Sequence, residues 1–235
     1  MIFEQNSLRI LTGWGCFPLN EMYVIICGEI IEWYQNQSRD FPWRYTKDPY
    51  KIMIAEFMLH RTKANQVVPA YIKFIEKYSD IETLAKANAE DIKKVTEHLG
   101  LHWRVKNFSE AAKYIIENHN EKFPEDYIKL QEIPGVGEYI AGAILTACFN
   151  KSAPVVDSNI ARFINRYFDL NLSGEIRRKK KIVELSSRLF EYENPRDLLF
   201  AIVDFASLIC KPGKPLCGKC PLKNDCKYID GPTSD

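Results

Sequence analysis

The chain has 235 residues, of which 46% are hydrophobic and 27% are charged, and its formal net charge is +1. This composition fits a globular protein with a sizeable core. No apolar run reaches the length of a membrane span, and the first residues lack the basic region of a signal peptide. We therefore expect a cytoplasmic protein, and its nearly neutral charge does not by itself indicate nucleic-acid binding.

The hydrophobic periodicity is helical nearly throughout the chain. In the first half, the expected helices span residues 21–35, 50–61, 67–77, 81–87, 89–99 and 104–118. Two more are expected around a glycine turn, the first beginning at Pro124 and the second at Gly137 or Glu138. The last expected helices span residues 158–167, 177–190 and 195–210. No segment alternates like a strand for long, so the sequence predicts an all-α protein.

Positive charge is distributed unevenly along the chain. Residues 174–181 hold five basic residues and one acidic residue, and residues 39–63 hold six basic and three acidic residues. Local patches of this kind can bind phosphates on a protein that is neutral overall. A solvated helix face is an equally good explanation for any single patch.

A glycine turn interrupts the helical pattern at Ile133-Pro134-Gly135-Val136-Gly137. Glycines can adopt backbone angles that side chains forbid. The first amides of the helix that follows have no partner within that helix and point outward. An amide-rich turn at a helix N-terminus is a site for an anion such as phosphate. Glycine turns between helices are common, so a purely structural turn is the alternative.

Four of the seven cysteines lie near the C-terminus with the spacing C-x6-C-x2-C-x5-C, namely Cys210, Cys217, Cys220 and Cys226. Four thiols in one short loop suit a metal site. Disulfides are disfavoured in the cytoplasm. These cysteines could bind either an iron–sulfur cluster or zinc, because Cys-x2-Cys is a common zinc half-site. Zinc fingers usually use two closely spaced pairs, however, and only one pair here is closely spaced. The remaining cysteines are expected to be buried small hydrophobes: Cys16, Cys27 and Cys148.

The glycine turn and an aspartate twenty residues after Gly137, Asp157, together resemble the helix-hairpin-helix DNA glycosylases, the superfamily of endonuclease III and the MutY adenine glycosylases. The resemblance implies that Gly135, Val136 and Gly137 grip a phosphate of DNA and that Asp157 is the catalytic carboxylate. The cysteine spacing is similar to the cluster loop of the endonuclease III and MutY branch. The resemblance therefore implies a [4Fe–4S] cluster with a structural role.

Cleavage of an N-glycosidic bond builds positive charge on the sugar, and a fixed carboxylate stabilises that charge. Asp157 follows an apolar run and stands at the start of an expected helix, so its alternative role is that of a helix N-cap. The same residue can serve both as the N-cap and as the catalytic carboxylate. Tyr139 fills the position at which bifunctional members of the superfamily carry a lysine nucleophile. Tyrosine cannot form a Schiff base, so we expect a monofunctional enzyme that leaves an abasic site. A packing aromatic is the alternative for Tyr139.

The helix expected at residues 50–61 carries further candidates. Glu56 lies among apolar neighbours, which makes it a candidate pocket residue with a raised pKa, or else a solvent-facing residue. The resemblance places a base-contacting glutamate here. His60 and Arg61 occupy the stretch from which family members insert a side chain into the gap left by a flipped base, and Lys63 is expected to contact DNA. An ordinary surface histidine is the alternative for His60.

Within the superfamily, the chain is similar to the archaeal G·T mismatch thymine-DNA glycosylases (Mig type) from about Arg39 to Cys226. The likeness includes Tyr139, the run Arg39-Asp40-Phe41-Pro42-Trp43-Arg44 and the run Asn165-Arg166-Tyr167-Phe168. It implies an enzyme that removes thymine or uracil opposite guanine. His60 and Asn65-Gln66 depart from that pattern, which leaves the exact base open.

A MutY-like adenine glycosylase acting on A·G or A·8-oxoguanine is the close alternative, because many of those enzymes also carry this tyrosine. Their Gln-Gln-Thr is replaced here by His60-Arg61-Thr62, and their Tyr-Tyr segment by Leu101-His102-Trp103-Arg104. Only nine residues follow Cys226, where they usually add a domain that reads 8-oxoguanine. Two hypotheses come from other functional classes. A non-catalytic DNA-binding module would be expected to lose Asp157, which is present here. The other hypothesis is a zinc-bound interaction domain.

We expect two helical lobes. Residues 40–151 would form a helical barrel that ends in the hairpin. Residues 1–39 would form an N-terminal helix that packs with residues 152–235 around the cluster. Tyr139 and Asp157 would face each other across the cleft. The expected partner is double-stranded DNA with a mismatched base pair, bound by a monomer that is cytoplasmic, associated with the nucleoid and free of membrane contact.

Overall fold

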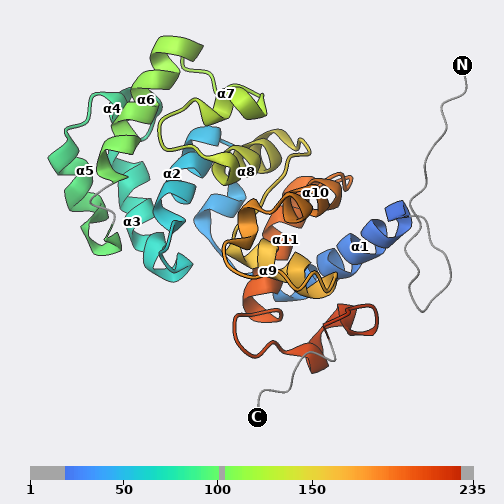
Figure 1. Ribbon diagram of the computed structural model, residues 1–235. Coiled ribbons are helices and arrows are strands. Elements are labelled where there is room, and N and C mark those ends of the chain that lie inside the picture. Colours follow the sequence, from blue (N-terminus) through green and yellow to red (C-terminus); the bar gives the residue numbers. More distant parts are fainter. Residues whose placement is uncertain (1–18, 101–103, 229–235) are drawn as a thin grey trace, which may run out of the picture. The chain divides into compact units, whose positions relative to one another are not determined.

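The computed structural model describes residues 19–100 and 104–228 (Figure 1). Within these ranges the regular elements are α-helices and short 3-10 helices, with no strand, which confirms the predicted all-α class. None of the described helices is long and apolar enough to cross a membrane. The chain divides into two compact units, which we name the terminal unit (Met1–Ser38 with Val156–Asp235) and the central unit (Arg39–Val155).

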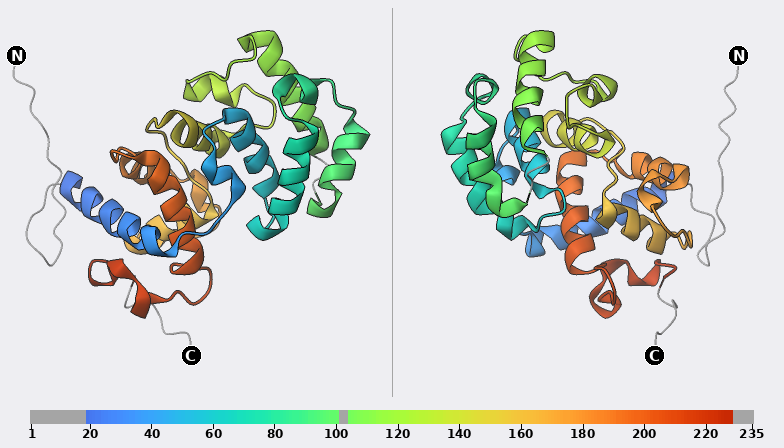
Figure 2. Two further views of the ribbon diagram at one scale, coloured as in Figure 1. Left: turned by 180° about the vertical axis from the view of Figure 1, so that it is seen from behind. Right: turned by 60° about the vertical axis from the view of Figure 1, so that its left-hand side comes forward.

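The terminal unit joins the first described helix to the C-terminal third of the chain. Its α-helices are α1 (Leu19–Gln37), α9 (Ser158–Tyr167), α10 (Lys180–Leu189) and α11 (Pro195–Leu208). Its 3-10 helices are η4 (Ile176–Arg178), η5 (Cys217–Lys219) and η6 (Pro221–Asn224). Helix α1 packs along α11 and contacts η6, and the views of Figures 1 and 2 agree on this pairing. These contacts lie within one compact unit.

The core of the terminal unit forms where α1, α9 and α11 meet. Ile26 and Ile30 of α1 are completely buried. The Trp33 ring meets the Phe205 ring edge-on at 5.4 Å, and the Phe163 ring meets Phe205 at 5.6 Å. Apolar side chains three and four positions apart share one face of a helix, so this core follows from the sequence periodicity.

The central unit is built around α2 (Pro49–Leu59), which is apolar on nearly every side. Asp48 caps this helix by accepting a hydrogen bond from the Tyr50 amide at 2.9 Å. Helix α2 packs against α3 (Ala64–Lys77) and α8 (Glu138–Phe149). The other elements of the unit are shorter or amphipathic and cover this centre: η1 (Pro42–Tyr45), α4 (Ile81–Ala85), α5 (Ala89–Thr96), η2 (Glu97–Leu99), α6 (Val105–His119) and α7 (Tyr127–Gln131). A helix that is hydrophobic all round belongs in the interior.

Several helix ends differ from the expected ones. Helix α2 ends at Leu59, two residues early, because Arg61 adopts the left-handed conformation with φ +61°. Helix α3 begins three residues early, at Ala64, and contains Pro69. Its first turn forms because the Gln66 amide donates to the carbonyl of Lys63 at 2.9 Å. Cys16 and residues 101–103, part of the segment compared with the adenine glycosylases, lie outside the described residues.

Candidate active site

The glycine turn joins α7 to α8 in the central unit. Helix α7 begins at Tyr127 rather than at Pro124, because the Asp126 carboxylate caps it by accepting from the amides of Ile128 and Lys129 at 3.0 and 2.9 Å. Helix α8 begins at Glu138, as predicted, with Gly137 as its N-cap and no side chain capping it. No side chain therefore takes up the first backbone amides of α8.

The residues between the two helices serve the turn in different ways. Gly135 has φ +85°, and a Cβ there would lie 2.8 Å from the Asn107 side-chain nitrogen. The Val136 amide donates to the Ile133 carbonyl at 2.9 Å and its side chain is buried, so Val136 closes the turn. Gly137 has an ordinary extended conformation, and a Cβ there would meet nothing within 4 Å. The open space at Gly137 leaves room for a ligand.

Gly142 brings α8 close to the segment that leads toward Asp157. A Cβ at Gly142 would lie 2.3 Å from the carbonyl oxygen of Pro154 and 3.2 Å from a methyl group of Val155. This contact was not predicted from the sequence, although a glycine within a helical pattern usually has a packing reason.

Asp157 caps α9 in the terminal unit, which confirms its predicted role as an N-cap. One carboxylate oxygen accepts from the amides of Asn159 and Ile160 at 2.8 and 2.7 Å. The other accepts from the side-chain nitrogen of Asn159 at 2.7 Å. Burial raises the pKa of Asp157, while these hydrogen bonds and the positive charge of Arg162 act to lower it. The carboxylate is therefore fixed in direction and partly removed from water.

Arg162 connects the Asp157 cap to the start of the cysteine loop. Its guanidinium donates to the Asn159 side-chain oxygen at 3.1 Å, to the Ala206 carbonyl at 2.6 Å and to the Cys210 carbonyl at 2.9 Å. A planar guanidinium can hold several acceptors in fixed directions. Asn159 and Arg162 therefore orient Asp157. Their role was not predicted, because the acceptors on and just after α11 lie far away in the sequence.

The cysteine loop is held by a second arginine one turn further along α9. Arg166 donates to the carbonyls of Lys211 and Gly213 at 2.8 and 3.0 Å, and approaches the Cys210 sulfur at 3.7 Å. Its guanidinium also lies over the Tyr228 ring, 4.8 Å from the ring centre. These contacts position the first turn of the loop relative to α9.

The four loop cysteines share one hollow, which they line together with the aromatic rings of Phe163, Tyr167, Phe205 and Tyr228. Burial raises the pKa of Cys220 to about 12 and also raises the pKa values of Cys210 and Cys226. Among the residues described, no three His, Cys, Asp or Glu side chains are grouped closely enough to hold one metal ion. Cys27 is buried as predicted, whereas Cys148 is only half-buried.

The candidates of the central unit lie on α2, α8 and the turn after α2. Glu56 is half-buried on α2, and Tyr139 is half-buried in the first turn of α8, the helix that packs against α2. Tyr139 and Asp157 belong to different units, so the expectation that they face each other stays a prediction.

His60, Arg61 and Lys63 fall in the turn between α2 and α3 rather than on a helix. His60 is half-buried, and Arg61 and Lys63 are exposed. Arg61 takes a left-handed backbone conformation that costs a non-glycine residue energy. The turn is stabilised by the Thr62 amide, which donates to the Leu59 carbonyl at 3.2 Å. Arg61 is therefore presented on a tight, strained turn.

A hollow of about 490 Å³ in the central unit contains none of the predicted site residues. Four carboxylates line it: Asp48, Asp80, Glu121 and Glu125. Such a negatively charged hollow would repel a phosphate backbone, so the size of a hollow does not locate the site in this protein.

Comparison with known proteins identifies the family of the chain. Residues 54–191 match the family model described as "HhH-GPD superfamily base excision DNA repair protein". The chain belongs to this superfamily. It is 34% identical over 212 residues to a thymine/uracil-DNA glycosylase of Methanothermobacter thermautotrophicus, a match covering 90% of the chain and 96% of that protein.

Two further similarities bear on the branch of the HhH-GPD superfamily. A solved structure of a thermostable thymine-DNA glycosylase superposes with a TM-score of 0.83 at 35% identity, over 89% of the chain and 97% of that structure. An adenine DNA glycosylase of Buchnera aphidicola is 34% identical over 201 residues, which span 84% of the chain but 56% of that enzyme. The thymine enzymes therefore match over nearly their whole length, and the adenine enzyme over about half.

Proposed function

We propose that the protein is a monofunctional DNA glycosylase that hydrolyses the N-glycosidic bond of thymine or uracil mispaired with guanine and leaves an abasic site. The observation that carries this proposal is the end-to-end similarity to a thymine/uracil-DNA glycosylase. The fixed carboxylate of Asp157 supports it, because glycosidic cleavage needs a negative charge held beside the sugar.

In this proposal Asp157 stabilises the positive charge that develops on the sugar and orients the attacking water. Asn159 donates to the carboxylate and Arg162 donates to the Asn159 side-chain oxygen, so the carboxylate does not reorganise during the reaction. Tyr139 lines the sugar site and offers no amine, so water rather than the protein attacks the sugar. Glu56, on the helix next to that of Tyr139, contacts the extruded base.

The partner in this proposal is double-stranded DNA with a mismatched base pair, bound by the protein as a monomer. The target base must leave the stack, and a mismatched base is cheaper to extrude than a paired one. Gly135 and Gly137 present the backbone amides at the start of α8 to a phosphate, while Val136 stabilises the turn from within. His60, Arg61 and Lys63 fill the gap left by the extruded base or contact the nearby backbone.

We further propose that Cys210, Cys217, Cys220 and Cys226 bind a [4Fe–4S] cluster. The hollow that the four cysteines line together supports this. Zinc is the alternative, since it also binds four cysteine thiolates. Metal ligation deprotonates thiols outright, which offsets their raised pKa values. A cluster held by these cysteines would crosslink the loop that Arg162 and Arg166 tie to α9.

The second candidate is an adenine glycosylase. The identity to the adenine enzyme equals the identity to the thymine/uracil enzyme, although it covers a smaller share of the matched protein. Both candidates use a hydrolytic Asp157 and differ in the extruded base. The distinction is therefore made by substrate and not by mechanism.

A panel of duplexes tests the proposal. The purified protein is incubated with duplexes that carry G·T, G·U, A·G or A·8-oxoguanine, and abasic sites are then cut with hot alkali. We expect alkali-dependent cleavage of the strand with thymine or uracil opposite guanine. Cleavage of only the adenine strand would establish the second candidate, and no cleavage of any duplex would overturn both.

A further inference from the structure

A run of five consecutive basic residues, Arg177 to Lys181, lies at the junction of η4 and α10, and we name it the cationic segment. All five side chains are exposed. Arg177 pairs with Glu175 at 2.6 Å and Lys181 with Glu184 at 3.6 Å. Within residues 19–100 and 104–228, no carboxylate lies within ion-pair distance of the three residues between them: Arg178, Lys179 and Lys180.

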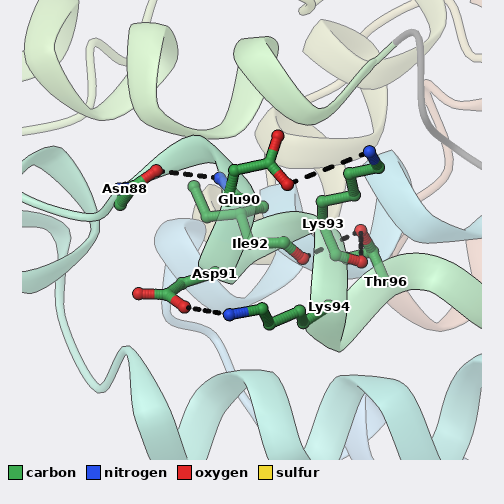
Figure 3. A network of polar contacts seen from close by, with 7 residues as sticks. All are labelled: Asn88, Glu90, Asp91, Ile92, Lys93, Lys94 and Thr96. Atoms are coloured by element: carbon green, nitrogen blue, oxygen red, sulfur yellow. Dashed lines mark hydrogen bonds and ion pairs between the residues drawn. The ribbon is translucent and has the colours of Figure 1, made fainter.

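The lysines on the surface of α5 show the opposite arrangement. Lys93 pairs with Glu90 at 3.9 Å and Lys94 with Asp91 at 3.3 Å, both within the same helix (Figure 3). Lys86, at the end of α4, likewise pairs with Glu82 at 3.6 Å. These lysines are neutralised by their own helix, whereas the cationic segment keeps a local excess of positive charge.

The cationic segment begins next to the candidate catalytic carboxylate. Helix η4 packs against α9, the helix that Asp157 caps, and α10 packs against α9 as well. The hydrogen bond and charge of Glu175 raise the pKa of Arg177, and the charge of Asp157 adds to this effect. Every nucleotide sugar in a strand is linked to two phosphates. A sugar held at Asp157 would therefore bring its neighbouring phosphates to this surface.

The chemistry of the segment favours a phosphate backbone over a protein surface. Lysine is depleted in protein–protein interfaces, whose centres are apolar. None of the large exposed hydrophobic side chains of the described chain falls within residues 174–184. Flexible cations with no large exposed apolar side chain beside them suit a regular row of anionic groups.

We propose that Arg178, Lys179 and Lys180 bind phosphates of the DNA strand that flank the target nucleotide. This inference rests on the proposed function and adds a second backbone contact to that of the glycine turn. It also explains how a protein with a net charge of +1 binds DNA, because the charge is concentrated where the strand lies.

The salt dependence of binding tests the inference. The triple variant Arg178→Gln, Lys179→Gln, Lys180→Gln is compared with the wild type and with a control that loses the same charge, Lys86→Gln, Lys93→Gln, Lys94→Gln. The probe is a labelled duplex with a tetrahydrofuran abasic-site analogue opposite guanine, which the enzyme cannot turn over. Affinity is measured by fluorescence anisotropy between 50 and 200 mM KCl, and circular dichroism confirms that each variant is folded.

Each phosphate contact contributes about 0.9 to the slope of log affinity against log salt. We expect the slope of the triple variant to be shallower by about 2.7. A fourfold rise in salt should therefore weaken DNA binding by the wild type about 40-fold more than it weakens DNA binding by the triple variant. The control variant should keep the wild-type slope.

An unchanged slope in the triple variant would overturn the inference and leave an acidic protein as the partner to test. An equal decrease in the control would overturn it too, because the effect would then be one of net charge. Failure of the wild type to excise any mismatched base would instead refute the proposed function. The non-hydrolysable probe keeps the two failures distinct.

Discussion

Gly142→Ala is expected to destabilise the protein, although alanine is the better helix former. The new Cβ would lie 2.3 Å from the carbonyl oxygen of Pro154. Ordinary carbon–oxygen contacts are about 3.3–3.6 Å, so α8 and the chain around Pro154 must separate by roughly 1 Å. Ala153 and Val155 on either side are buried, and the segment cannot move without disturbing the core.

The magnitude follows from two opposing contributions. Replacing glycine by alanine within a helix stabilises by about 1 kcal/mol. Overpacking a well-packed interior costs about 1–3 kcal/mol of stability. The new Cβ of Gly142→Ala would contact backbone, which moves less easily than a side chain, so we take the upper end of this range. The net loss is about 2 kcal/mol, which lowers Tm by about 4–8 °C in a protein of this size. Asp157 lies two residues after Val155, and a misplacement of about 1 Å in a catalytic group can cost on the order of 10²-fold in rate.

Thermal unfolding and single-turnover excision are measured for Gly142→Ala and for a matched control, Gly28→Ala. Gly28 also lies within a helix, but a Cβ there would meet nothing within 4 Å. The control should gain about 0.5–1 kcal/mol and retain full activity. If Gly142→Ala were as stable and as active as the control, the close packing of α8 against the segment before Asp157 would be refuted.

Three further predictions concern the site. Tyr139→Lys should produce partial strand cleavage and a borohydride-trappable protein–DNA adduct, because it introduces an amine at the sugar; trapping with the wild type, or none with an active lysine variant, would contradict the placement of Tyr139. Burial raises the pKa of Asp157, and only the ionised form of Asp157 stabilises the sugar cation. On acidification, the excision rate should therefore begin to fall at a higher pH than it would if Asp157 had the pKa of an ordinary aspartate. Arg162→Gln removes a charge that lowers this pKa and should move the fall in rate to still higher pH, and an unchanged pH profile would exclude that coupling. Iron analysis should show loss of iron from Cys217→Ser and full iron in Cys148→Ser, whereas equal iron in both would contradict the cluster ligands.

Periodicity and the glycine turn were sufficient to predict the all-α class, the helix pair around the turn and the start of α9 at Ser158. Helix ends were harder, because they depend on local competition between residues. Asp126 caps α7 and moves its start beyond Pro124. The left-handed backbone of Arg61 ends α2 early, and nothing in the residue type indicates this conformation.

The contacts that support the site could not be read from the sequence. Arg162 reaches Ala206 and Cys210, acceptors that lie 44 and 48 residues further along the chain. Only the packing of α9 against α11 brings these groups together. The sequence motif located Asp157, but the residues that orient Asp157 depend on tertiary structure.

Detection of the released base tests the central claim most directly. A duplex with a single G·T mismatch is incubated with excess enzyme, and the products are analysed by liquid chromatography with mass spectrometry. The proposed function predicts one equivalent of free thymine and an intact strand that carries an abasic site. Asp157→Asn should still bind the duplex but lose on the order of 10²-fold or more in rate. Absence of free thymine with the wild type, or full release by Asp157→Asn, would contradict the proposed function or its catalytic residue.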